Sequence, residues 1–305
     1  MKKDLVRISD LERSDVDYIF CRAKELKKWQ KEGVPYKPLA GKTLGMIFDK
    51  SSTRTRLSFE VGMYQLGGLA IFLSSRDTQL GRGETIADTA RIMSRYLDAV
   101  MIRTFSQEMV EEFARWATIP VINGLTDLLH PCQILSDIFT ILEKRGSYEN
   151  VTVAYIGDGN NVANSWLEAA CVLPIRVVMA CPAGYEPNET IFQMAKERAK
   201  DSVSIGHDPK EAVKDADFIY TDVWTSMGQE AEQEARRRSF QDYQINGDLL
   251  AIAPGHVCVM HCLPAHRGEE ITEEVIEGPH SIVFDQAENR LHVQKSILEI
   301  LMKGV

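Results

Sequence analysis

The residues best suited to chemistry lie together in one short segment, Ser51 to Arg56. Four of its six side chains carry hydroxyl groups, and the other two are arginines, Arg54 and Arg56. The segment separates an apolar run, Thr43–Phe48, from a helical run, so the hydroxyl groups stand at a predicted helix N-terminus. The free N–H groups of such an end bind phosphate, and arginines add forked donors. Because capping alone needs one hydroxyl, the segment predicts a site for a small phosphate compound.

Further polar side chains follow the next strand-like runs of the amino-terminal half. Arg103 ends the run Ala99–Arg103, and His130 and Gln133 follow the run Ile119–Ile122. Ligands of open parallel sheets bind beyond the carboxyl ends of the strands. Cationic side chains and a hydroxyl-rich helix cap at one sheet edge therefore favour an anion site over isolated structural ion pairs. The amide of Gln133 can both donate and accept, which suits a planar, amide-like group.

Two loops of the carboxy-terminal half leave alternatives open. Gly157–Asn161 follows a strand and resembles part of a dinucleotide-binding turn, but Val162 stands where the third glycine of that pattern belongs. Asn160 and Asn161 either contact a polar ligand or cap the helix that follows. Asp222–Gly228 follows another strand, where the carboxylate of Asp222 could hold an ammonium group or belong to a plain loop.

The run His256–Cys262 is rich in potential metal ligands. In a strand, however, His256 and Cys258 face one side of the sheet and His261 the other, because successive side chains alternate. The histidines and cysteines therefore do not converge, and no other pair has the spacing of a zinc site. We predict a core strand with polar ends and no metal site.

These loops are positioned by alternating strand-like and helical runs, which predict parallel sheets covered by helices on both faces. Predicted helices include Glu84–Leu97, Gln107–Ala117 and Cys132–Arg145. The predicted strands are Thr43–Phe48, Leu69–Leu73, Ala99–Arg103, Ile119–Ile122, Val151–Ile156, Arg176–Ala180, Val203–Ile205, Phe218–Thr221 and Val257–Met260. The fold class is α/β, with two doubly wound parallel-sheet domains joined by interdomain helices.

The two sets of strands predict the domain boundaries. Residues 1–145 form the first domain, because the helix Cys132–Arg145 stops at Gly146. Residues 146–287 form the second domain. The last helix, in residues 288–305, is expected to pack back on the first domain.

Composition excludes several classes of protein. The 305 residues carry a net charge of −9, which argues against a broad nucleic-acid surface. No run of 18 apolar residues predicts a membrane span, and the first residues have no signal-peptide pattern. Six cysteines without a CxxC pair indicate reduced thiols. We expect a cytoplasmic protein.

Four motifs, taken in order, resemble the aspartate/ornithine carbamoyltransferase family over nearly the whole chain. They are Ser52-Thr53-Arg54-Thr55-Arg56, His130-Pro131-Cys132-Gln133, Asp222-Val223-Trp224-Thr225-Ser226-Met227-Gly228 and His261-Cys262-Leu263-Pro264. The first two are shared across the family, whereas the other two point to its ornithine branch.

The resemblance implies an amino-terminal domain for carbamoyl phosphate, a carboxy-terminal domain for L-ornithine, and no cofactor. The implied enzyme forms L-citrulline and phosphate and serves arginine biosynthesis. It is a homotrimer, or an assembly of trimers, with sites shared between subunits. The implied carbamoyl-phosphate ligands are Ser52, Thr53, Arg54, Thr55, Gln79 from a neighbouring subunit, Arg103, His130, Gln133, Cys262, Leu263 and Arg290. The implied ornithine ligands are Asn161, Asp222, Ser226 and Met227, and the catalytic residues are Arg103, His130, Cys262 and Asp222.

Three other functions stay open at this point. The acceptor could be another amine, such as putrescine or an N-acylated ornithine, although neither offers both the α-ammonium and the α-carboxylate that this set of residues would hold. The reaction could also run in the catabolic direction. A protein that binds carbamoyl phosphate without catalysis is disfavoured, because every expected site position carries the expected type of residue.

Overall fold

The computed structural model describes residues 3–74, 83–225 and 230–303. The chain divides into two compact units. Unit 1 comprises Met1–Phe139 and Glu288–Val305, and unit 2 comprises Thr140–Ala287. Among the described helices, none combines the length and the apolar character that crossing a bilayer requires.

Unit 1 contains a parallel sheet of four strands. The strands are β1 (Thr43–Phe48), β2 (Leu69–Ser74), β3 (Ala99–Arg103) and β4 (Val121–Leu125), in the spatial order β2-β1-β3-β4. The chain leaves β1 toward β2 on one side and returns to β3 on the other. The order therefore reverses between β1 and β3, and a doubly wound sheet binds ligands at such a switch point.

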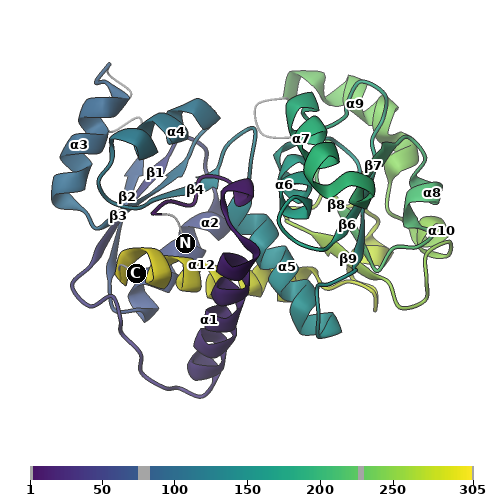
Figure 1. Ribbon diagram of the computed structural model, residues 1–305. Coiled ribbons are helices and arrows are strands. Elements are labelled where there is room, and N and C mark those ends of the chain that lie inside the picture. The colour runs from purple at the N-terminus through teal and green to yellow at the C-terminus, as the bar shows by residue number, and fades with distance from the viewer. Residues whose placement is uncertain (1–2, 75–82, 226–229, 304–305) are drawn as a thin grey trace. The chain divides into compact units, whose positions relative to one another are not determined.

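Helices cover both faces of this sheet (Figure 1). Those of unit 1 are α1 (Arg13–Lys31), α2 (Thr53–Gln65), α3 (Ile86–Tyr96), α4 (Gln107–Trp116), the start of α5 (Pro131–Arg145), most of α12 (Val283–Lys303) and the short 3-10 helix η1 (Ile8–Asp10). On one face, Ala90 of α3 and Phe113 of α4 pack with Ile47 and Ile102 of the sheet. The hydroxyl groups of Thr85 and Ser106 accept backbone N–H groups and so cap these two helices.

Helix α12 is joined to unit 1 by polar contacts as well as apolar ones. Glu299 accepts hydrogen bonds from Arg22 of α1 at 2.9 Å, and Lys27 of α1 donates to Asn289 at 2.7 Å. Gly62 of α2 brings the two helices close, since a Cβ there would lie 3.3 Å from the Lys295 side chain. These contacts fix the start of α12, where Arg290 lies.

Unit 2 contains a parallel sheet of five strands. They are β5 (Thr152–Ile156), β6 (Arg176–Ala180), β7 (Val203–Gly206), β8 (Phe218–Thr221) and β9 (Cys258–His261), in the order β7-β6-β5-β8-β9. Here the order reverses between β5 and β8. The loops after these two strands, and after β9 beside them, are therefore brought to one edge.

The helices of unit 2 again lie on both sides of its sheet, with α6 and α7 on one face and α8, α9 and α10 on the other (Figure 1). They are α6 (Asn161–Ala170), α7 (Glu189–Ala199), α8 (Pro209–Val213), α9 (Gln233–Phe240), α10 (Gly247–Leu250) and α11 (Glu273–Ile276), with 3-10 helices η4 (Lys200–Ser202), η5 (Glu230–Glu232) and η6 (Gln241–Tyr243). Ala154 and Ile219 of the sheet pack with Val213, Phe240 and Leu249 in one buried cluster.

The structure confirms the predicted fold class and all nine predicted strands. The largest difference is β4, which begins at Val121 rather than Ile119 and extends to Leu125. Pro120 has no N–H group for the ladder, which favours a start after it. The polar Asn123 is accommodated because its side chain donates to Val6 and to Gln107 inside the unit.

Candidate functional site

The carboxyl ends of β1 and β3 bring a hydroxyl group and two guanidinium groups together in unit 1. Thr55 lies in the first turn of α2 and is fully buried, and Arg103 is the last residue of β3. The Thr55 hydroxyl accepts hydrogen bonds from Arg290 Nη2 at 3.0 Å and from Arg103 Nη1 at 3.4 Å. Both arginines are more than nine-tenths buried. This arrangement concentrates fixed positive charge at the switch point of the sheet.

The start of α5 adds an imidazole and an amide to the same cluster. Arg290 Nη1 donates to Gln133 Oε1 at 2.6 Å and to His130 Nε2 at 3.4 Å. Since a guanidinium group can only donate, Nε2 of His130 is the acceptor and carries no proton. Arg290 therefore connects α12 with both α2 and α5. The predicted grouping of Thr55, Arg103, His130, Gln133 and Arg290 is present in the structure.

The sequence left open whether His130 is cationic, and its surroundings bear on this. Burial first, and then the positive charges of Arg290, Arg103 and Arg54, hold the pKa of His130 well below its ordinary value. The imidazole is therefore neutral near pH 7 and can donate one hydrogen bond rather than pair as a cation.

The segment Ser51 to Arg56, rich in hydroxyl groups and arginines, is only partly directed at this cluster. Ser52 caps α2 by accepting the N–H of Thr55 at 3.2 Å, as predicted, and Arg54 is half-buried. Thr53 is exposed. Arg56 was expected to join the anion site, but it donates to Glu60 at 2.9 Å and lies over the ring of Phe72. The expectation of two arginines at the cap is therefore wrong for Arg56.

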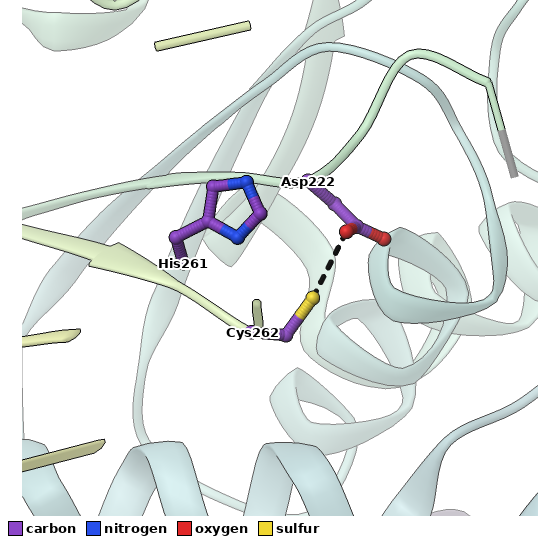
Figure 2. A group of neighbouring side chains, drawn as sticks. All are labelled: Asp222, His261 and Cys262. Carbon is purple, nitrogen blue, oxygen red and sulfur yellow. Dashed lines mark hydrogen bonds between the residues drawn. The ribbon is translucent and has the colours of Figure 1, made fainter. Parts of the chain in front are cut away.

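Unit 2 presents an acidic group at its own switch point. Asp222 follows β8, and Figure 2 shows the sulfur of Cys262 directed at its carboxylate, with a separation of 2.9 Å to Oδ1. Asn160 donates to Oδ2 of the same carboxylate at 2.8 Å. The Asn160 side chain also accepts from two N–H groups at the start of α6. The capping alternative is thus confirmed for Asn160, which also contacts Asp222, while Asn161 is the first residue of α6.

A second carboxylate lies near Asp222. Burial raises the pKa of Asp158 to about 6, and the negative charge of Asp222 acts in the same direction. Arg236 opposes the shift through an ion pair at 3.1 Å, and it also donates to the carbonyl of Trp224 at 2.9 Å. Arg236 thus compensates Asp158, and Asp222 is the carboxylate of this strand edge that suits an ammonium group, whereas the edge of unit 1 carries arginines.

The turn after β9 is held by a buried histidine. His261 Nδ1 accepts the N–H of Leu263 at 2.9 Å, and Nε2 lies 3.0 Å from Glu270 Oε1. The side chains of His261 and Glu270 are fully buried. Leu263 has a φ of 57°, in the left-handed region that a leucine rarely adopts. The His261 ring thus stabilises an unfavourable backbone turn at Cys262-Leu263.

This geometry bears on two alternatives from the sequence, a metal site and a dinucleotide-binding turn. Asp222, His261 and Cys262 each offer a ligand atom within 4.8 Å of the others. Metal binding there would require His261 to give up one of its two hydrogen bonds, so the geometry favours the hydrogen-bonded arrangement. Gly159 has a local explanation without a dinucleotide, because a Cβ would lie 2.2 Å from the backbone of Glu186.

Some predicted residues lie outside the described part of the chain, namely Gln79, Ser226, Met227 and Gly228. Other residues were not predicted. Asp137, which accepts from Gln133, is four positions further along α5, so helical spacing could have indicated it. Arg236 and Glu270 reach the site edge only through tertiary packing, for which the sequence carries no local signal.

Comparison with known protein families gives matches over both units. Residues 3–143 match the carbamoyl-P binding domain of aspartate/ornithine carbamoyltransferases, and residues 149–301 match the Asp/Orn binding domain. An ornithine carbamoyltransferase of Syntrophus aciditrophicus is 67% identical over 302 residues, which cover 99% of this chain and 100% of the relative. The anabolic ornithine carbamoyltransferase of Pyrococcus furiosus is 54% identical, covering 99% and 97%.

Solved structures give the same result. The structure of ornithine carbamoyltransferase from Pyrococcus furiosus superimposes with a TM-score of 0.95, covering 99% of this chain and 97% of that one. The anabolic enzyme from Campylobacter jejuni gives a TM-score of 0.91 at 41% identity, covering 99% of each chain.

The buried pair of His261 and Glu270 generates a stability prediction. His261→Ala leaves the Glu270 carboxylate buried without its imidazole partner, which should lower the free energy of unfolding by about 2–4 kcal/mol. His256→Ala is the matched control, because His256 also contacts a carboxylate, Asp217, at 3.0 Å but is 62% exposed. We expect the control to lose less than about 1 kcal/mol. Urea unfolding followed by the fluorescence of unit 2 would measure the loss of unfolding free energy in both variants. Equal losses would contradict the stabilising role of the buried pair.

Proposed function

Because the chain belongs to the aspartate/ornithine carbamoyltransferase family, we propose that it transfers the carbamoyl group of carbamoyl phosphate to the δ-amine of L-ornithine. The products are L-citrulline and phosphate, and the reaction serves arginine biosynthesis. One observation carries the proposal beyond family membership, namely the buried cluster in which Arg103 and Arg290 share the hydroxyl of Thr55. This cluster offers cationic and hydroxyl donors to a phosphate and a carbonyl group in one place.

The chemistry requires such donors. The δ-amine attacks the carbonyl carbon, the carbonyl oxygen gains negative charge, and the phosphate then leaves with the electrons of the broken C–O bond. Donors fixed beside the developing oxyanion lower the barrier most. In unit 1 we assign this role to Arg103, Thr55 and the single N–H of neutral His130. Ser52, Thr53 and Arg54 at the start of α2, together with Arg290, hold the phosphate oxygens.

For the carbamoyl amide we assign Gln133 in unit 1, whose side-chain carbonyl can accept an N–H group. Membership of the family further assigns the main chain of Cys262 and Leu263 in unit 2 to this amide. The Leu263 N–H is bound to His261 Nδ1, which fixes the peptide at this turn.

In unit 2 the acidic strand edge supports the ornithine role. We assign the α-ammonium group to Asp222 and the α-carboxylate to Asn161, with Ser226 and Met227 completing the grip. We assign the thiol of Cys262, which donates to Asp222, to the neighbourhood of the δ-amine. A free alkylammonium has a pKa of about 10.4, so the δ-amine must lose a proton before it attacks. An acceptor without an α-ammonium group would leave Asp222 without its ligand.

An exposed apolar surface supports the proposal of a homotrimer. Leu69 of β2 is 59% exposed and Tyr64 of α2 is 81% exposed, and further apolar side chains of these two elements are also exposed: Leu57, Val61, Ile71 and Phe72. β2 is the edge strand of its sheet and leads directly to the segment that holds Gln79. A second copy of the chain covering this surface could receive Gln79 into its own phosphate site.

All six cysteines are free thiols, which supports a cytoplasmic location.

The direct test of function is the formation of citrulline from carbamoyl phosphate and L-ornithine, with putrescine as a competing acceptor. We expect citrulline without added metal or nucleotide, and little product from putrescine. Arg103→Leu should lower kcat roughly a hundredfold to a thousandfold, the usual effect of losing one oxyanion donor. Arg56→Leu is the control from the same strand edge, because Arg56 faces Glu60. A folded Arg103→Leu variant with the kcat of the unaltered chain would refute the proposed role.

Shared sites predict complementation between inactive variants. Gln79→Ala and Arg54→Gly subunits, each inactive alone, should regain activity when they are refolded together. In a cyclic trimer each mixed assembly has one site with both side chains, so a random equal mixture should reach about a quarter of full activity. Native mass measurement identifies the mixed trimers. Mixed trimers without activity above that of the separate variants would show that Gln79 does not act across subunits.

A further inference from the structure

A buried carboxylate lies one turn behind the proposed carbamoyl-phosphate site of unit 1. Asp137 is fully buried on α5, four residues after Gln133, and so shares a helix face with it. Asp137 Oδ1 accepts a hydrogen bond from Gln133 Nε2 at 2.8 Å. The proposed mechanism uses Gln133 but assigns nothing to Asp137.

The orientation of the Gln133 amide follows from its two neighbours. Arg290 Nη1 lies 2.6 Å from Gln133 Oε1, and a guanidinium group has only donors, so the atom facing it must be the carbonyl oxygen. The amino group must then face Asp137, whose oxygen accepts it. The carbonyl oxygen has a second lone pair, so Gln133 can accept a further hydrogen bond, while an N–H group is already held by Asp137.

We propose that Asp137 is a positioning residue that fixes the Gln133 amide and thereby makes the pocket select a carbamoyl group over an acyl group of the same shape. This inference rests on the proposed function. A carbamoyl group ends in NH2, which the fixed carbonyl oxygen accepts, whereas an acetyl group ends in a methyl that offers no donor. The same oxygen repels the ligand's carbonyl oxygen, which turns toward Thr55 and Arg103.

Asp137 is needed for this selection because Gln133 is almost fully buried. Without an acceptor at position 137, the Gln133 amino group would be a buried donor lacking its partner, which is costly. Arg290 alone would then hold the amide through its oxygen, and the amide could tilt about that one contact. A carbonyl oxygen that is no longer held toward the ligand discriminates less between NH2 and methyl.

The test compares carbamoyl phosphate with acetyl phosphate, which has a methyl in place of the amino group. Asp137→Leu removes the acceptor but keeps the branched shape of the side chain, and we expect its kcat/KM for carbamoyl phosphate to fall roughly tenfold to a hundredfold. The inhibition constant of acetyl phosphate should change far less. The preference for carbamoyl phosphate over acetyl phosphate, taken from these two quantities as a discrimination ratio, therefore falls. Asp137→Asn keeps an acceptor oxygen and should lose much less. Ser136→Ala, a change at a buried polar neighbour on α5, is the matched control and should keep the ratio.

A double-mutant cycle separates positioning from a purely structural role. In a Gln133→Ala background, Asp137→Leu should have little further effect on kcat/KM, because its partner is already gone. Equal losses in both backgrounds, or an unchanged discrimination ratio, would overturn the proposal.

A second pair of variants carries the test if Asp137→Leu does not fold. Gln133→Glu places two carboxylates against each other, and Gln133→Glu/Asp137→Asn restores a donor facing an acceptor. The double variant should recover at least about tenfold in kcat/KM over Gln133→Glu, and no recovery would count against the proposal. If the unaltered chain forms no citrulline, the proposed function fails by itself. The selection by Asp137 is then read from calorimetric binding of the two phosphate compounds, where an equal ratio in all variants overturns it.

Discussion

The arrangement of the candidate site in unit 1 depends on the hydrogen bonds of the Arg290 guanidinium group. Its donors reach Thr55 on α2 and both His130 and Gln133 at the start of α5, while Arg290 itself belongs to the last helix of the chain. A rigid planar fork can hold three elements in one geometry, which a flexible ammonium group could not do as well. The position of the hydroxyl, imidazole and amide groups therefore depends on how α12 packs on α1 and α2. A charge buried in this way is costly unless hydrogen bonds and opposite charges compensate it, so the contacts of Arg290 are as important as its position.

Sheet topology explains why the two units carry groups of opposite charge at equivalent places. In each sheet the strand order reverses once, between β1 and β3 in unit 1 and between β5 and β8 in unit 2. The loops at a reversal diverge to opposite faces and leave room for a ligand. Unit 1 fills that place with Arg103 and the α2 cap, and unit 2 fills it with Asp222 and Asn160. The same architecture thus serves an anionic substrate in one unit and an ammonium group in the other.

Most strands could be predicted from sequence because they are buried apolar runs followed by polar residues, although β2 is largely exposed. The prediction was wrong where helix geometry decides. Arg54 and Arg56 are two positions apart on α2, which places them on nearly opposite sides of the helix, so only one can face the site. The sequence left the charge of His130 open, and burial together with the neighbouring arginines lowers its pKa. The sequence left open whether Asn160 contacts a ligand or caps a helix, and the structure shows the cap together with a contact to Asp222. Contacts such as Arg236 with Asp158 depend on tertiary packing and leave no pattern in the sequence.

The central claim is that unit 1 holds carbamoyl phosphate through the contacts that Arg290 organises. The most direct test is calorimetric binding of phosphonoacetamide, a stable analogue of carbamoyl phosphate, without ornithine. Arg290→Met should weaken binding by about 2–5 kcal/mol, the cost of removing one partner of a buried charge pair. Arg22→Met is the control, since Arg22 is a largely buried arginine of the same unit that pairs with Glu299. The account predicts a large loss for Arg290→Met and little change for Arg22→Met. Equal affinity in the Arg290→Met variant and the unaltered chain would contradict it.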